Sequence, residues 1–222
     1  MGQDLAQVLP DLFGTWYERS DEESLGPGHI CWALVPFLLE GRPQFVHFDY
    51  DAANRGEPVQ CSIGPQKQDT FNHRPVVPAP YTLEASEALV VLRAKRRPVI
   101  LLSEPLQFVG RLRKDFPPSV VACPIYSFKD HHIPEFRSRV IALEYPSVFY
   151  VPDGRDFPEG FVRFDRVIML PTGYLQKSGV RLASEALALL REHFWWFLTG
   201  IQGEELKALR SLIQESARPG GP

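Results

Sequence analysis

The chain has few cysteines, a net charge close to zero and no long apolar run. Its three cysteines stand alone among 222 residues, without a Cys-x-x-Cys or cysteine–histidine spacing, so neither a disulfide framework nor a zinc site is indicated. The formal net charge of −3 gives no global signal for nucleic acid, and any such site must be a local basic patch. Neither a membrane span nor a signal peptide is recognisable, so we expect a cytoplasmic protein without membrane contact.

Proline, by contrast, is abundant, with 21 residues. Proline at this density breaks helices and central strands and favours short strands joined by rigid turns. Hydrophobic residues make up 44% of the chain and charged residues 23%, which is typical of a folded globular protein. The length fits one large domain, or a small domain with additions.

Apolar spacing predicts a mainly β fold between two helical ends. Helical spacing over 3–17, interrupted by Pro10, predicts a helical extension within residues 1–25. Strand-like runs that are separated by turn residues predict a small antiparallel barrel. The runs are 29–39, 44–50, 88–93, 98–103, 119–126, 139–144, 148–151 and 163–170.

The barrel domain is expected to span 26–200. Residues 51–80 are polar and rich in glycine and proline, which predicts little regular structure in an insertion over 41–87. A strong helix is predicted at 184–198, apolar on nearly all sides and including Trp195 and Trp196. We expect the barrel to cover one side of this helix, and segment 3–17 or a second subunit to cover the other side. Residues 201–222 are predicted to form a short helix and a disordered tail.

Two segments each place an arginine near the start of an apolar, strand-like run. They are Lys-Arg-Arg-Pro-Val-Ile-Leu-Leu-Ser at 95–103 and Phe-Val-Arg-Phe-Asp-Arg-Val at 161–167. In the second segment Arg163 and Asp165 are two residues apart, so on a β-strand they project from the same face. A guanidinium beside a carboxylate can hold a phosphodiester and move a proton. An ordinary ion pair is the alternative interpretation.

Basic and aromatic residues alternate over 127–139. This mixture suits a single nucleic-acid strand, through attraction of phosphates and stacking of bases, although solvated surface charge explains it equally. The residues are Phe128, Lys129, His131, His132, Phe136, Arg137 and Arg139. The adjacent histidines point apart and no third ligand is spaced for them, so we predict no metal site and no cofactor. Further basic clusters lie at 93–97 and 111–114.

The order of these segments resembles the MazF/PemK (Kid) family of toxin endoribonucleases. Arg-Arg-Pro-Val-Ile-Leu-Leu-Ser is followed by Val-Val-Ala-Cys-Pro-Ile-Tyr-Ser, Arg-Phe-Asp-Arg-Val-Ile-Met-Leu-Pro and a closing leucine-rich helix. The resemblance implies an SH3-like barrel with a packed C-terminal helix, a homodimer and a cognate antitoxin as partner. It also implies metal-independent cleavage of single-stranded RNA, by attack of the ribose 2′-hydroxyl on the adjacent phosphate.

The resemblance also implies roles for individual residues. Arg97, Ser127, Arg163 and Asp165 match the family's catalytic positions. His29 stands where most members have an aspartate, and joins Tyr126, Phe128, Lys129, His131, Arg137 and Arg139 as a candidate RNA contact.

Tyr126 departs from the family pattern, because threonine is usual at this position. Its hydroxyl stands several ångströms farther from the backbone than that of threonine. Tyr126 and Ser127 could therefore divide the catalytic task differently, Tyr126 could stack on a base or fill a strand end, or catalysis could be lost. A catalytically inactive SH3-like barrel that binds RNA or a protein is the alternative function.

Overall fold

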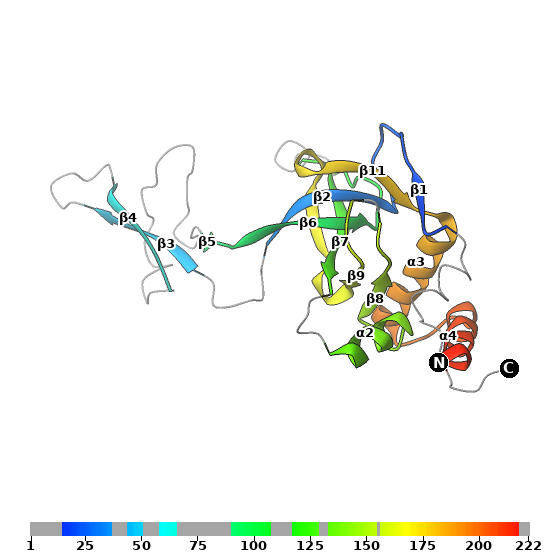
Figure 1. The fold of residues 1–222 in the computed structure, drawn as a ribbon. Coiled ribbons are helices and arrows are strands. Elements are labelled where there is room, and N and C mark those ends of the chain that lie inside the picture. Colours follow the sequence, from blue (N-terminus) through cyan, green and yellow to red (C-terminus); the bar gives the residue numbers. More distant parts are fainter. Residues whose placement is uncertain are drawn as a thin grey trace. The chain divides into compact units, whose positions relative to one another are not determined.

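The computed structural model describes residues 15–36, 44–50, 58–65, 90–107, 117–128, 133–154 and 156–217. The chain forms two compact units (Figure 1): Met1–Leu34 together with Arg96–Pro222, and Val35–Lys95. Both contain antiparallel sheet, and the helices α3 and α4 end the chain. The predicted mainly β fold with a C-terminal helix is confirmed at this level.

An eight-stranded sheet is the framework of the first unit. Its order is β1-β11-β2-β6-β7-β9-β8, and β10 also pairs with β7. The strands are β1 (Tyr17–Arg19), β2 (His29–Pro36), β6 (Ala94–Leu101), β7 (Ser119–Ser127), β8 (Val148–Val151), β9 (Gly160–Arg163), β10 (Ile168–Pro171) and β11 (Gln176–Leu182). Within the described ranges no pairing joins β1 to β8, so the predicted closed barrel is not observed there.

The predicted strand over 163–170 is in fact two strands on the same edge of β7. Ile125 pairs with Val162 on β9, and Ala122 pairs with Ile168 on β10. Between these two pairs β7 advances by three residues, whereas the chain that pairs with it advances by six. The 3-10 turn η2 (Phe164–Arg166) accommodates the three extra residues. The interruption has a cause in packing, because it turns the Phe164 side chain, 2% exposed, into the core.

The second unit contains a three-stranded sheet in the order β4-β3-β5, formed by β3 (Gln44–Tyr50), β4 (Pro58–Gly64) and β5 (Val90–Val91). Strand β3 matches the predicted strand at 44–50. Strand β4 contradicts the expectation of irregular structure there. The alternation of Val59, Cys61 and Ile63 with polar residues is the period-two signal that the surrounding glycines and prolines obscured.

Helix α2 (Pro134–Ile141) corrects the predicted strand at 139–144. Pro134 occupies the start of the helix, where a missing N–H costs nothing, and Glu135 lies in its first turn, where negative charge favours the helix dipole. Val140 and Ile141 are buried, and half-buried Phe136 packs against the same core. This helical spacing, rather than the apolar run beginning at Val140, decides the local structure.

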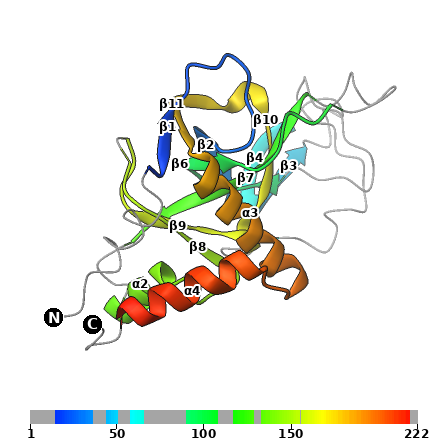
Figure 2. The ribbon, with the colours of Figure 1, turned by 90° about the vertical axis from the view of Figure 1, so that its right-hand side faces the viewer.

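Helix α3 (Ser184–Thr199) confirms the predicted C-terminal helix and buries Ala186, Leu189, Leu190 and His193. It runs from the β1–β11 end of the sheet towards α4 (Glu204–Ala217) in both views (Figures 1 and 2). The buried Leu206 and Ile213 of α4 join the core. Neither α3 nor α4, nor any other helix of the described ranges, is long and apolar enough to cross a membrane.

Helix α4 covers part of α3, which the sequence did not predict, and the expected cover by segment 3–17 or a second subunit stays a prediction. Arg210 of α4 lies 4.9 Å over the Trp196 ring, so α4 covers this side, whereas Trp195 is 59% exposed. Segment 3–14 and the tail 218–222 lie outside the described residues. Tyr17 begins strand β1, so the predicted N-terminal helix does not extend to residue 17.

Candidate functional site

Arg97 on β6 and Tyr126 on β7 lie opposite each other on one face of the large sheet. The ladder pairs Val99 with Pro124, and two steps further along both antiparallel strands Arg97 faces Tyr126. The Arg97 guanidinium carbon lies 4.5 Å from the centroid of the Tyr126 ring. This stacking holds a permanent positive charge at a defined point of the face.

Arg163 lies on the same face, on the other side of β7. Tyr126 pairs with Phe161, and their rings stack at 5.9 Å with an interplanar angle of 21°. Arg163 follows Phe161 by two residues on β9, so strand alternation directs both side chains to one face. Strands β6 and β9 flank β7, and two strand spacings with an offset of two residues along the strands separate the backbones of Arg97 and Arg163 by roughly 12 Å.

Asp165 forms a two-pronged ion pair with Arg163. Nε of Arg163 donates to Oδ1 at 3.0 Å and Nη2 donates to Oδ2 at 2.6 Å, while Nε of Arg166 is 3.9 Å from Oδ2. The hydrogen bonds from Arg163, with the positive charges of both arginines, lower the pKa of the Asp165 carboxyl. Side-chain exposures of 36% and 40% leave Arg163 and Asp165 accessible to a ligand. The pair meets across the turn η2, not along a continuous strand.

Cys123 lies where β7 faces the interruption. Its Sγ donates to the carbonyl oxygen of Arg163 at 3.7 Å, and burial raises the pKa of its thiol. Cys31 is likewise free and buried. A protonated, buried Cys123 gives the site structural support rather than a nucleophile.

Ser127 is separated from this group. It follows Tyr126 on β7, whose ladder with β9 continues to the pair of Ser127 with Gly160. Consecutive residues of a strand point to opposite faces, so the Ser127 side chain is directed away from the face of Tyr126 and Arg163. The structure therefore does not bring Ser127 together with the arginines.

The aromatic residues of the 127–139 segment pack against each other. The Phe128 ring lies 5.2 Å from that of Phe161 and 6.2 Å from that of Phe136. The Phe136 ring also contacts Phe161 at 5.6 Å and Tyr145 at 5.8 Å. These rings join α2 to the sheet, a packing role that the alternating pattern alone did not reveal.

The arginines of α2 are held in ion pairs. Arg137 donates to both carboxylate oxygens of Glu159, at 3.0 and 2.8 Å, and Arg139 donates to Glu144 at 2.7 Å. The Arg139 guanidinium also stacks on Tyr145. Lys129, His131 and His132 lie outside the described residues. In the described ranges no three histidine, cysteine or acidic residues gather in a way that could hold a metal ion.

His29 is buried, at 6% exposure, in a polar network of its own. Its Nε2 lies 2.9 Å from Oγ of Ser20, and its Nδ1 lies 3.0 Å from the N–H nitrogen and 2.9 Å from the carbonyl oxygen of Gly26. The neighbouring Gly28 donates its N–H to Leu101 at the far end of β6. Four strand residues, about 13 Å, separate that point from Arg97, so the structure does not bring His29 to the arginines.

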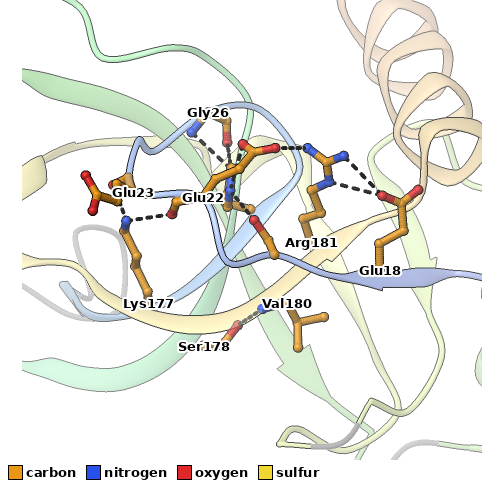
Figure 3. A network of polar contacts seen from close by, with 10 residues as sticks. Glu18, Glu22, Glu23, Gly26, Lys177, Ser178, Val180 and Arg181 are labelled. Atoms are coloured by element: carbon orange, nitrogen blue, oxygen red, sulfur yellow. Dashed lines mark hydrogen bonds and ion pairs between the residues drawn. The ribbon is translucent and has the colours of Figure 1, made fainter.

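The surroundings of His29 were not anticipated from the sequence. Figure 3 shows Arg181 of β11 between two carboxylates, those of Glu18 on β1 and Glu22. Lys177 donates to the carbonyl oxygens of Glu22 and Glu23. The acidic run at 21–23 was the available signal, but Lys177 and Arg181, which bind Glu22, are more than 150 residues later in the chain.

No model of a known protein family, no curated protein and no solved structure matches this chain. A functional assignment therefore rests on the residues and their geometry. The group with the most definite chemistry is Arg97, Tyr126, Arg163, Asp165 and Arg166, which we call the arginine face.

Proposed function

We propose that the chain is a sequence-specific endoribonuclease of the MazF/PemK type that cleaves single-stranded RNA without metal. The arginine face supports the proposal most directly: Arg97 and Arg163 flank Tyr126 on one face, and Asp165 is bound to Arg163. The proposal includes an SH3-like barrel, a homodimer, a cytoplasmic location, a cognate antitoxin and the role of a type II toxin.

The chemistry requires positive charge at a phosphate and a base for the ribose hydroxyl. The 2′-oxygen attacks phosphorus, the 5′-oxygen of the next nucleotide leaves, and a 2′,3′-cyclic phosphate remains. Two guanidinium groups on the strands that flank β7 can bind a phosphodiester from two sides and stabilise its added negative charge.

Asp165 supplies the base in this scheme. Its carboxylate is a weak base while Arg163 donates two hydrogen bonds to it. When Arg163 turns to a bound phosphate, those hydrogen bonds are lost and the pKa of Asp165 rises towards its ordinary value. The carboxylate is thereby a better acceptor for the 2′-hydroxyl proton only when substrate is present. Arg166 stays near Asp165 and limits its movement.

Tyr126 favours a second candidate, a catalytically inactive barrel that binds RNA or a protein. Its ring is stacked on Phe161 and lies under Arg97, so it fills the position where the family's threonine would present a small hydroxyl. The proposal assigns Ser127 no contact with the reacting phosphate, because strand alternation directs it to the other face. Proton transfer to the leaving oxygen then depends on the Tyr126 hydroxyl or on water.

The test is cleavage of a single-stranded RNA pool in EDTA, with mass spectrometry of the product ends. We expect 2′,3′-cyclic phosphate and 5′-hydroxyl termini. Arg97→Ala and Arg163→Ala should each slow cleavage by about two to four powers of ten. Arg181→Ala is the control, because Arg181 is 37% exposed and paired with acids, as Arg163 is. Binding without cleavage would favour the second candidate, and loss of both would exclude an RNA function.

A further inference from the structure

A second arginine of β6 is stacked on an aromatic ring on the opposite face of the sheet. The Arg96 guanidinium carbon lies 4.7 Å from the ring centroid of Trp32 on β2. Nη2 of Arg96 donates at 2.7 Å to Oε1 of Gln176, the residue that pairs with Trp32 across β11 and β2. The guanidinium plane is therefore held over the indole by stacking and by a hydrogen bond, and little ordering remains to be done on binding.

This part of the face carries exposed apolar side chains. Leu34, two residues after Trp32, is 66% exposed, and Tyr174, two residues before Gln176, is 77% exposed. Tyr174 ends the 3-10 turn η3 (Thr172–Tyr174), so the β2–β11 register does not extend to it, but two residues span at most about 7 Å and keep it near Gln176. Large exposed apolar side chains that lie near one another mark an interaction surface. We call the set Trp32, Leu34, Arg96, Tyr174 and Gln176 the Trp32 platform.

The charge of the platform identifies the kind of partner. Arg96 is its permanently charged residue, and the platform contains no acidic side chain. Arg96 also belongs to the run 93–97, in which four of five residues are basic. A polyanion fits this charge, and bases of single-stranded RNA stack both on aromatic rings and on guanidinium planes.

We propose that the Trp32 platform is a base-binding subsite for single-stranded RNA. One unpaired base stacks on the exposed side of the Arg96 guanidinium, so that base, guanidinium and indole form one stack, and a neighbouring base stacks on Tyr174. The inference rests on the proposed RNA function and extends it. Arg96 and Arg97 are consecutive and point to opposite faces of β6, so the subsite lies on the face of the sheet opposite the arginine face.

Fluorescence anisotropy with a labelled pool of random single-stranded 2′-O-methyl RNA of about 16 nucleotides tests this, since such RNA lacks the attacking hydroxyl. Trp32→Leu, Arg96→Lys and Arg96→Ala should each raise Kd by about 5- to 150-fold. Trp195→Leu is the matched control: Trp195 is 59% exposed on α3, outside the platform, and its loss should leave Kd unchanged.

Arg96→Lys separates stacking from charge. Lysine keeps the positive charge but has no plane for a base, so binding should weaken while the slope of log Kd against log salt stays that of the wild type. Arg96→Ala also removes a positive charge next to the RNA, so it should reduce this slope by less than about 0.7, the value for one full phosphate contact on a single strand. Wild-type affinity of the Arg96→Lys variant would overturn the base-stacking subsite and leave a simple charge contact.

The outcomes distinguish the subsite from the proposed function. If the wild type binds RNA and the Trp32 and Arg96 variants bind equally well, the subsite is wrong and the endoribonuclease proposal stands. If the wild type binds no RNA, both the subsite and the endoribonuclease proposal are wrong. Circular dichroism checks folding. Should Trp32→Leu unfold, Tyr174→Ala replaces it, because a ring exposed by 77% contributes little to the fold, and its Kd should rise by at least about 5-fold.

Discussion

Arg163 and Asp165 share two parallel hydrogen bonds although the residue between them, Phe164, is 2% exposed and points into the core. A continuous strand would also direct residues 163 and 165 to one face, but it would leave their side chains side by side along the edge of β7. The turn η2 instead folds Asp165 back onto the guanidinium of Arg163. The ion pair is thus a product of the turn that buries Phe164.

The first prediction concerns the pKa of Asp165. Replacement of Arg163 by Gln removes a charge and the two charge-assisted hydrogen bonds, so the carboxyl pKa should rise towards its ordinary value. Carbon-detected NMR titration of the side-chain carboxyl measures the shift directly. Arg96→Gln is the control, because Arg96 points to the opposite face and should leave the titration unchanged. An unaltered pKa in Arg163→Gln would mean that the ion pair does not persist in solution.

The second prediction concerns stability in acid. His193 is fully buried, its Nε2–H donates to the carbonyl oxygen of Tyr145 at 2.8 Å, and burial lowers its pKa to about 4. The unfolded chain binds this proton near pH 6.5, so unfolding takes up a proton between these values and acid favours the unfolded state. The titration of His193 alone should lower the free energy of unfolding by about 2 kcal/mol when the pH falls from about 7 to about 5.

Urea unfolding of the wild type and of His193→Gln at both pH values measures this contribution. Glutamine can still donate to the Tyr145 carbonyl but does not titrate, so the variant should be less sensitive to acid by the same amount. Equal pH dependence in the two proteins would show that His193 is protonated as readily in the folded state as in the unfolded state.

The third prediction concerns Gly160, which pairs with Ser127 at the start of β9. A Cβ atom at residue 160 would overlap the carbonyl oxygen of Tyr126, whereas no atom lies within 4 Å of one built at Gly173. Gly160→Ala should therefore lower the unfolding free energy by at least about 2 kcal/mol, through displaced backbone next to the arginine face. Gly173→Ala should be nearly neutral. Thermal unfolding of both variants tests the contrast, and equal melting temperatures would contradict it.

The fourth prediction concerns Arg137, a candidate RNA contact from the sequence. Its guanidinium is bound to both oxygens of Glu159, which also accepts the hydroxyl hydrogen of Tyr150 at 2.6 Å. A double-mutant cycle of Arg137→Ala and Glu159→Ala should yield a coupling of about 1 kcal/mol in unfolding free energy, since both side chains are partly exposed. The RNA affinity of Arg137→Ala should match that of the wild type. A large loss of affinity would show that Arg137 does contact RNA.

Local sequence patterns predicted the secondary structure correctly where the packing partners of a residue lie close to it in sequence. They also did so where one apolar face decides the structure of an element. The continuous apolar character of 184–198 predicted α3. The two-residue spacing grouped Arg163 with Asp165, but through a strand, whereas their ion pair forms across the turn η2. The interruption between β9 and β10 was not predictable in this way, because its cause is the contact of Phe164 with Phe194 of α3, thirty residues later. Helix α2 was missed because Val140 and Ile141 form a strand-like run when the earlier Pro134 is ignored.

The candidate site shows the same division. The order of the motifs alone assigned Tyr126 and Ser127 to one site. Once β7 is known to be a strand, alternation puts their side chains on opposite faces of the sheet. His29 was grouped with the RNA contacts because of its place in the sequence, and its burial depends on Ser20 and on the loop around Gly26. The Arg96–Trp32 stack was invisible because the two residues come from strands separated by the whole second unit.

The turn η2 also makes the site dependent on residues that never meet a substrate. The Phe164 ring contacts Phe194, Phe197 and His193 of α3 at 5.1 to 6.0 Å, and it lies between the two members of the Arg163–Asp165 pair in sequence. Without residues 164–166, Arg163 and Val167 would continue one unbroken ladder opposite Pro124 and Cys123. A change in the aromatic packing of α3 therefore reaches Asp165 through a single buried ring.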